Sequence, residues 1–246
     1  MMYGYGNSMF LFNNGIIATP AGNPLWDSLY AVYKAESNAN DELGVYNGTA
    51  QGGLTYTAGK SGNAFTGNGT TGYVSLPDNS FNSLTNDFSV SAWINVNSLT
   101  GNQTIFSNLS YNNSNTLSNG FSILMRNGFL YFEIYSNTGV FTQLLYASLL
   151  STNTWYNIVI TRKYSTRSRI YINGSQVTAN TSSLDPTFIT TLIPIPSSIC
   201  AWKYNASNTI NYLNGKVDEV NVWTKELTST EVTELYNAGA GKFYPY

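Results

Sequence analysis

Short runs of apolar residues, separated by polar turn residues, repeat along most of the chain. Each run is rich in β-branched and aromatic residues and is bounded by Asn, Ser, Gly or Asp, a pattern typical of strands in packed antiparallel sheets. Many short strands at regular spacing predict an all-β sandwich or jelly roll. We expect strands near residues 29–34, 54–57, 72–76, 87–96, 103–107, 120–125, 129–135, 140–146, 154–162, 168–173, 198–203 and 216–223.

One short helix is expected close to the C-terminus. The stretch from Thr228 to Glu231 has the spacing of a capping box, in which the hydroxyl and the carboxylate satisfy backbone amides reciprocally. Val232, Leu235 and Tyr236 then share one face, and Gly239 is expected to supply the left-handed stop. We expect this helix to cap one open end of the sandwich. The polar stretch 107–119 is expected to form a protruding loop, and 164–168 and 203–209 to form turns.

Residues 1–25 differ from the rest of the chain. The apolar runs 9–12 and 16–18 flank Asn13-Asn14-Gly15, and Asn-Gly between apolar runs predicts a hairpin. An isolated hairpin is marginally stable in water, so this one is expected to pack on the sandwich or on another chain. The side chains expected to anchor such an assembly are Phe10, Leu11, Phe12, Ile16 and Ile17.

Four segments carry a family resemblance: DFSVSAWI at 87–94, WYNIVITR at 155–162, RIYING at 169–174 and GKVDEVNVW at 215–223. In this order and spacing they resemble a laminin-G-like jelly roll of the concanavalin A-like lectin/glucanase superfamily. The resemblance extends over roughly 26–238 and implies an antiparallel jelly-roll sandwich. We therefore expect an anchoring segment at 1–25 and a single jelly-roll domain at 26–246, a common length for one all-β domain.

The composition limits the classes of molecule that such a domain can bind. Only 10% of the residues are charged and the net charge is −2, so the surface must be mostly uncharged amide and hydroxyl, which suits sugar recognition. Since Lys and Arg form no cluster, nucleic acid and anionic membranes are excluded as main partners. The first basic residue is Lys34, and the apolar run before it is interrupted, so we expect no secretory signal.

Enzymatic chemistry has little support in the sequence. Retaining glucanases of the superfamily carry Glu-x-Asp-x-x-Glu on one strand, where alternation points the carboxylates into one cleft. This chain has no such spacing and no His. Asp218 and Glu219 are adjacent, so in a strand they are expected to face opposite sides, one of them meeting solvent. The lone Cys200 is expected to be a small buried side chain. We therefore predict a non-enzymatic protein.

Calcium stays open as a cofactor. Several laminin-G-like modules bind it at a loop rim, and calcium takes six to eight oxygen ligands. In many relatives the stretch equivalent to 67–73 reads Phe-Asp-Gly-x-Asp-Asp-Tyr, whereas Asn68, Thr71 and Gly72 stand here at the acidic positions. The prediction is no cofactor, or a calcium site using Asn68, Asp78 or Asp218.

Aromatic residues, 19 of them Tyr, offer flat faces with polar tips for sugars or for protein interfaces. In 129–135, alternation places Tyr131, Glu133 and Tyr135 on one face, which forms a concave sugar platform or packs under a neighbouring loop. Three Trp residues inside strands are expected in the core, and Trp202 is expected to be the exposed one. The core Trp residues are Trp93, Trp155 and Trp223, and the ligand candidates are Tyr111, Asn112, Tyr131, Tyr135, Trp202 and Tyr204.

Three functions remain. The first is a virion structural or attachment protein of a bacteriophage or another large DNA virus, located in the virion. Its partners would be other virion proteins or copies of itself, together with host-surface polysaccharide. The second is a soluble or secreted carbohydrate-binding module, extracellular or at a cell surface. The third is a pure scaffold without ligand. The missing export signal and the apolar N-terminus favour the first.

Overall fold

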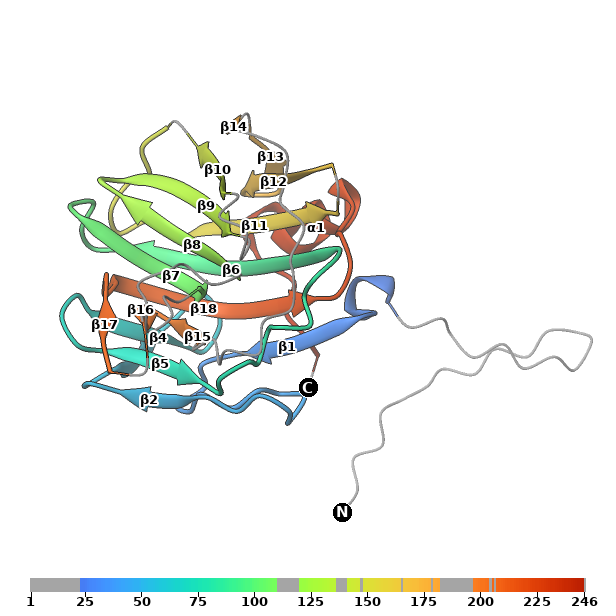
Figure 1. The fold of residues 1–246 in the computed structure, drawn as a ribbon. Coiled ribbons are helices and arrows are strands. Elements are labelled where there is room, and N and C mark those ends of the chain that lie inside the picture. The colour runs from blue at the N-terminus through green and yellow to red at the C-terminus, as the bar shows by residue number, and fades with distance from the viewer. Residues whose placement is uncertain are drawn as a thin grey trace, which may run out of the picture.

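The computed structural model describes residues 23–109, 120–135, 141–146, 148–164, 166–177, 179–181, 197–203, 205 and 207–245 (Figure 1). The first sheet contains β13 (Ser175–Gln176), β12 (Arg167–Ile172), β11 (Tyr156–Lys163), β6 (Phe88–Val96), β18 (Asn214–Trp223), β4 (Asn63–Asn68) and β3 (Thr55–Ala58) in that order, and β1 (Leu29–Tyr33) also pairs with β18. The second contains β14 (Ala179–Thr181), β10 (Phe141–Tyr146), β9 (Phe129–Tyr135), β8 (Gly120–Arg126), β7 (Asn102–Asn108), β15 (Ser197–Ile199), β5 (Tyr73–Leu76) and β2 (Thr49–Gln51).

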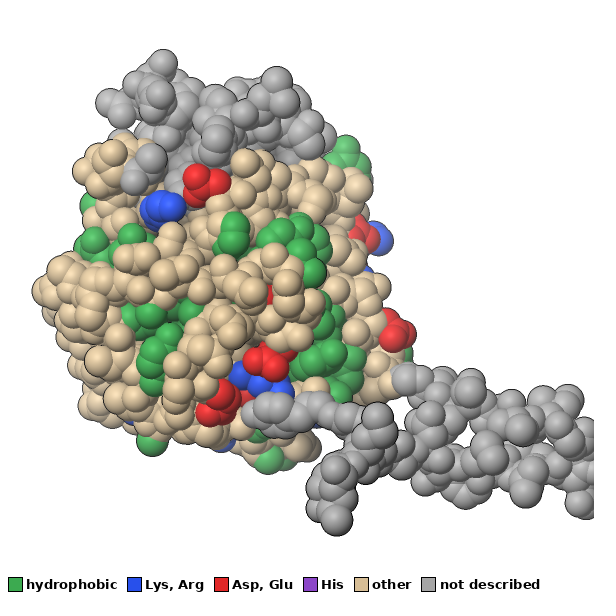
Figure 2. Space-filling view, turned by 90° about the horizontal axis from the view of Figure 1, so that it is seen from below, with side chains coloured by type: hydrophobic (Ala, Val, Ile, Leu, Met, Phe, Trp, Pro, Cys, Tyr) green, Lys and Arg blue, Asp and Glu red, His purple; other side chains and the backbone are tan. Residues whose placement is uncertain are grey.

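A separate hairpin and three helical segments complete the described part of the fold. The strands β16 (Trp202–Lys203) and β17 (Thr209–Ile210) form a separate hairpin. A 3₁₀ turn, η1 (Pro24–Trp26), precedes the first strand, and the helix α1 (Ser229–Tyr236) is followed by η2 (Asn237–Gly239). On the face shown in Figure 2, acidic and basic side chains are few and most of the surface is uncharged.

The core lies between the two sheets and follows the alternation of the strands. On β6, β8 and β9, every second side chain is apolar and buried in one continuous cluster: Phe88, Val90, Ala92, Ile94, Phe121, Ile123, Met125, Leu130, Phe132 and Ile134. Both ladders next to β6 are antiparallel, as are both ladders next to β8. The predicted antiparallel jelly-roll sandwich is confirmed. Cys200 is buried in the same cluster, as expected.

The helix α1 packs on the outer face of the first sheet (Figure 1). Its Tyr236 ring stacks on Trp93 of β6 at 6.0 Å. Val232 and Leu235 pack in a second apolar cluster with Trp223 of β18. The prediction that the helix caps an open end of the sandwich is therefore wrong, because outward-facing aromatic side chains of the central strands offer the larger apolar surface.

The position of this helix explains the burial of two of the three Trp residues that were predicted to lie in the core. Trp93 and Trp223 are buried, as predicted, but beneath the covering layer of the first sheet and not between the sheets. Trp155 precedes β11 and is half-buried, so its placement in the core is wrong. Trp155 follows the turn at 152–153, at the end of the sheet, where the rest of the fold covers it only in part.

The ends of α1 follow its local sequence closely. The Thr228 side chain accepts the Glu231 N–H, and the Glu231 carboxylate accepts the Thr228 N–H, so the predicted capping box is confirmed. The left-handed stop comes earlier than expected, at Asn237 with φ 48°, and not at Gly239. Asn tolerates this conformation because its short polar side chain can hydrogen-bond locally.

Several strand boundaries differ from the predicted ones. The strands β2, β4, β13, β14 and β17 were not expected, and β4 lacks a clear alternation because Asn63, Gly67 and Asn68 interrupt its apolar residues. The predicted strand 198–203 divides at Cys200, which has φ 67°. The strand β7 continues to Asn108, so 107–108 of the predicted loop 107–119 belong to a strand, and 110–119 lie outside the described residues. The described residues include no helix long and apolar enough to span a membrane.

A bulge in β18 contradicts the prediction for the adjacent carboxylates. The register with β6 shifts between Asp218 and Asn221, and Glu219 has φ 49°. Both Asp218 and Glu219 are buried, with 0% and 2% exposure, so the prediction that one of them meets solvent is wrong. The turn after β3 closes over Asp218, which accepts N–H bonds from Lys60 at 2.7 Å and Ser61 at 3.0 Å.

Candidate functional site on the outer face of the second sheet

A row of polar side chains crosses the outer face of the second sheet. The cross-strand registers place its members opposite one another from β2 to β10. Both chain neighbours of Ser75, Ser122 and Glu133 are buried in the core cluster, so alternation turns these three side chains to the other face of the sheet. In spatial order the row contains Thr49, Ser75, Ser198, Ser107, Ser122, Glu133 and Gln143.

Glu133 is the charged centre of this row. Its carboxylate lies 2.5 Å from the Arg126 guanidinium and accepts a hydrogen bond from the Gln143 amide at 2.6 Å. Arg126 also lies over the Tyr131 ring, 4.9 Å from the centroid. Glu133 is only 4% exposed. Its carboxylate interacts with the Arg126 cation and with the Gln143 amide. The result is a fixed group of planar polar side chains next to aromatic rings.

The hairpin β16–β17 covers the neighbouring part of the sheet. Its start folds back over β15, where the Ser198 hydroxyl donates to the Ala201 carbonyl at 2.7 Å. The half-buried Trp202 donates its indole N–H to the carbonyl of Leu109, the residue after β7. The Lys203 ammonium lies 3.4 Å from the Asp78 carboxylate. The hairpin therefore lies beside strands β8–β10, on which the outward Ser122 and Glu133 are each 4% exposed.

Tyr135 and Trp202 lie toward the same end of the sheet. Gly120, which has no side chain, pairs with Tyr135 across β8 and β9. Leu109, the acceptor of the Trp202 indole, follows Asn108, which pairs with Phe121. Tyr135 lies on β9, and Trp202 is bonded to the residue after β7. These two strands are two strand spacings apart, about 10 Å.

The predicted ligand residues have different outcomes. Tyr131 and Tyr135 face outward from β9, as predicted, and both are half-buried. One face of the Tyr131 ring is occupied by Arg126. Trp202 is half-buried, so the prediction that it is exposed is wrong. Tyr111, Asn112 and Tyr204 lie outside the described residues, as do the anchor residues Phe10, Leu11, Phe12, Ile16 and Ile17.

Sequence reasoning missed Arg126 and Gln143. They belong to strands on either side of Glu133, so only the register brings them to its carboxylate. One signal was present: Asn127-Gly128 joins β8 to β9, and a two-residue Asn-Gly turn sets the register of a hairpin. That register places Arg126 opposite Phe129, on the outward side of the sheet.

The three residues proposed for calcium lie on separate elements. The Asn68 side-chain oxygen accepts three backbone N–H groups, those of Thr70, Thr71 and Gly72. Asp78 follows β5 and pairs with Lys203, whereas Asp218 lies in β18 beneath the β3–β4 turn. In the part of the chain that the structure describes, no group of three or more acidic, His or Cys side chains could hold a metal ion. The calcium site stays a prediction.

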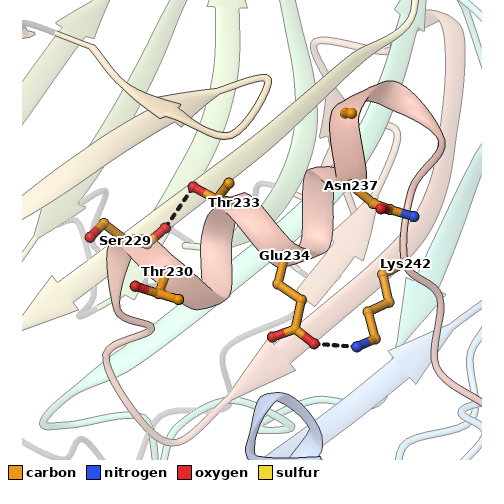
Figure 3. Close-up of a pocket in the computed structure, with 7 residues that line it drawn as sticks. Ser229, Thr230, Thr233, Glu234, Asn237 and Lys242 are labelled. Carbon is orange, nitrogen blue, oxygen red and sulfur yellow. Dashed lines mark hydrogen bonds and ion pairs between the residues drawn. The ribbon is translucent and has the colours of Figure 1, made fainter.

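A depression of about 840 Å³ lies along the solvent side of α1 (Figure 3). Its lining residues are Ser229, Thr230, Thr233, Glu234, Asn237, Ala238 and Lys242. Glu234 pairs with Lys242 and accepts a hydrogen bond from Asn23, which ties both ends of the domain to the helix. None of the lining residues is aromatic, so this depression offers no stacking surface, and the outer face of the second sheet is the stronger candidate site.

Comparison with known proteins agrees with the fold. Residues 68–233 match the family model described as the concanavalin A-like lectin/glucanases superfamily. No curated protein sequence matches the chain significantly.

Solved structures resemble the chain at low sequence identity. The receptor-binding domain of botulinum neurotoxin C/D mosaic serotype has a TM-score of 0.65 and 19% identity, over 86% of this chain and 51% of that chain. Domain 4 of AbnA, a GH43 extracellular arabinanase from Geobacillus stearothermophilus solved with arabinotriose, has a TM-score of 0.62 and 21% identity, over 84% and 97%. The botulinum neurotoxin DC binding domain in complex with SialylT has a TM-score of 0.64 and 20% identity, over 87% and 52%. The chain thus spans about half the length of the neurotoxin domains, and these likenesses show the shared fold.

Proposed function

Because the chain belongs to the concanavalin A-like lectin/glucanases superfamily, we propose that it is a carbohydrate-binding domain whose site is the outer face of β8–β10 beside the hairpin β16–β17. One observation carries the proposal: Tyr131 and Tyr135 flank a Glu133 carboxylate that Arg126 and Gln143 hold in place. Aromatic faces combined with a few fixed polar groups are what orient a sugar ring in a binding site.

The chemistry of a sugar ring matches this arrangement. A pyranose or furanose has an apolar face that packs on an aromatic ring, and Tyr135 and Trp202 supply such rings. Its hydroxyl groups donate to a carboxylate and accept from amide or hydroxyl groups, which Glu133, Gln143 and Ser122 supply. Because neighbouring side chains already hold the Glu133 carboxylate, little side-chain entropy is lost on binding.

The test is a glycan array followed by calorimetry on the glycans that bind. Tyr135→Ala and Trp202→Ala should each weaken binding about tenfold or more, equivalent to about 1.4 kcal/mol. Tyr164→Ala is the matched control, since Tyr164 is 37% exposed in the turn after β11 of the other sheet. Thermal melting of each variant separates lost binding from lost folding. If the intact protein binds no glycan, the scaffold function is favoured.

We also propose that the domain has no hydrolytic activity. Glycoside cleavage needs two carboxyl groups about 5 to 9.5 Å apart. On the described parts of β5, β7–β10 and β15, Glu133 is the sole carboxylate. Prolonged incubation with β-glucans, galactans and host capsule should release no reducing ends, and release that disappears in Glu133→Gln would contradict the proposal.

The finer role that we propose is attachment: the domain is displayed on a virion, bound to other virion proteins or to copies of itself, and contacts host-surface polysaccharide. The apolar residues at 9–12 and 16–18 support it, since fully burying each large side chain contributes about 1.5–3 kcal/mol. A mass-spectrometric inventory of purified virions tests this role. A chain that is monomeric at micromolar concentration and missing from virions would favour the alternative, a soluble or secreted carbohydrate-binding module.

A further inference from the structure

We infer that the glycan bound on β8–β10 is uncharged, and that Glu133 excludes acidic sugars such as sialic and uronic acids. This inference rests on the proposed function and adds the class of sugar.

Both cations at the site already have carboxylate partners. Arg126 lies 2.5 Å from Glu133, and Lys203 of the hairpin lies 3.4 Å from Asp78. The described residues of β7–β10 and β15 contain no other Lys or Arg. The carboxylate of an acidic sugar would therefore meet no cation that lacks a partner on these strands.

Competition for Arg126 is also unfavourable. The Glu133 side chain is 5% exposed, whereas that of Arg126 is 34% exposed. An acidic sugar that took the guanidinium would leave a buried carboxylate without its cation, and removing one partner from a buried ion pair is strongly destabilising. If instead both carboxylates shared the guanidinium, two like charges would lie close together on a face with little water.

The remaining groups suit hydroxyls. Ser122 lies directly opposite Glu133, and Gln143 lies opposite it on the other side. Ser107 continues the row across β7, but it is 0% exposed and Ser122 is 4% exposed, so a sugar hydroxyl would meet the half-buried Gln143 first. These uncharged groups donate and accept hydrogen bonds in both directions, as sugar hydroxyls do. The site thus has hydrogen-bond partners for a neutral sugar and a repulsive charge against an anionic one, the two elements that specific recognition combines.

The experiment compares neutral oligosaccharides with acidic ones of similar size, using calorimetry on the full chain. The probes are arabinotriose, galactotriose and lactose against trigalacturonate and sialyllactose. The variants are Glu133→Gln, which keeps an oxygen for Arg126, and Glu42→Gln, the same change at an exposed residue on a loop next to β1 of the other sheet. Thermal melting establishes that each variant is folded.

We expect the unmodified protein to bind at least one neutral probe about tenfold or more tightly than its acidic counterpart. Glu133→Gln should reduce that ratio to about threefold or less, and Glu42→Gln should leave it unchanged. Equal or tighter binding of the acidic probes by the unmodified protein would overturn the inference and leave the proposed function standing, even if Glu133→Gln fails to fold. Binding of neither class would overturn the proposed function itself.

Discussion

The buried carboxylates Asp218 and Glu219 should make the domain more stable in mild acid than in mild base. Burial raises the pKa of Asp218 to about 7, against the hydrogen bonds from Ser61 and Lys60. Burial, followed by the charge of Asp218, raises the pKa of Glu219 to about 8, against the charge of Lys34. One Glu219 carboxyl oxygen is buried and has no hydrogen-bond partner among the described residues.

The sign of the effect follows from proton binding. Above pH 4.5 the unfolded chain loses the protons of both carboxyls, whereas the folded chain keeps them until pH 7 to 8. The stabilisation is therefore fully present below the unfolded pKa values and is lost as the pH rises through the folded ones. Each pKa unit is equivalent to about 1.36 kcal/mol. Between pH 5 and pH 8.5 we expect the free energy of unfolding to fall by roughly 2–4 kcal/mol.

Urea unfolding of the unmodified protein and of Glu219→Gln at pH 5 and pH 8.5 measures this effect. The variant cannot ionise at position 219, so it should lose less stability and be the more stable protein at pH 8.5. Asp87→Asn is the control, because the Lys163 hydrogen bond lowers the pKa of Asp87, against a contribution from burial, and its titration therefore lies below the window. Equal pH slopes for the unmodified protein and Glu219→Gln, or a maximum of stability at pH 8.5, would refute the argument.

Three other predictions concern folding and assembly. Thr228→Ala removes the capping box of α1 and should lower the free energy of unfolding by about 1 kcal/mol in urea titrations. Phe132→Ala opens a cavity between the sheets and should lower it by about 3–5 kcal/mol. Deleting residues 1–22 should leave a folded domain that no longer joins its assembly, as measured by incorporation into particles. Asn23 is retained in that deletion because it donates to Glu234. Normal incorporation of the truncated chain would contradict the anchor hypothesis.

Local pattern in the sequence determined the elements whose physics is local. The alternation in 87–96 and 129–135 specifies which side chains face the core, since period-two alternation needs no knowledge of the partner strand. The capping box at Thr228 is a contact over three residues. The family resemblance added the order of the strands, and the family match over 68–233 agrees with it.

Tertiary structure decided whatever depends on contacts between distant residues. The outer-face Trp93 and Trp223 place α1 on the first sheet, and no pattern within the helix specifies which surface it will cover. The environment of Asp218 and Glu219 depends on a bulge in β18, and that of Asp218 also depends on a turn 158 residues earlier in the chain. The contact of Arg126 and Gln143 with Glu133 depends on the register of three strands, and a slip of one residue would turn these side chains to the other face.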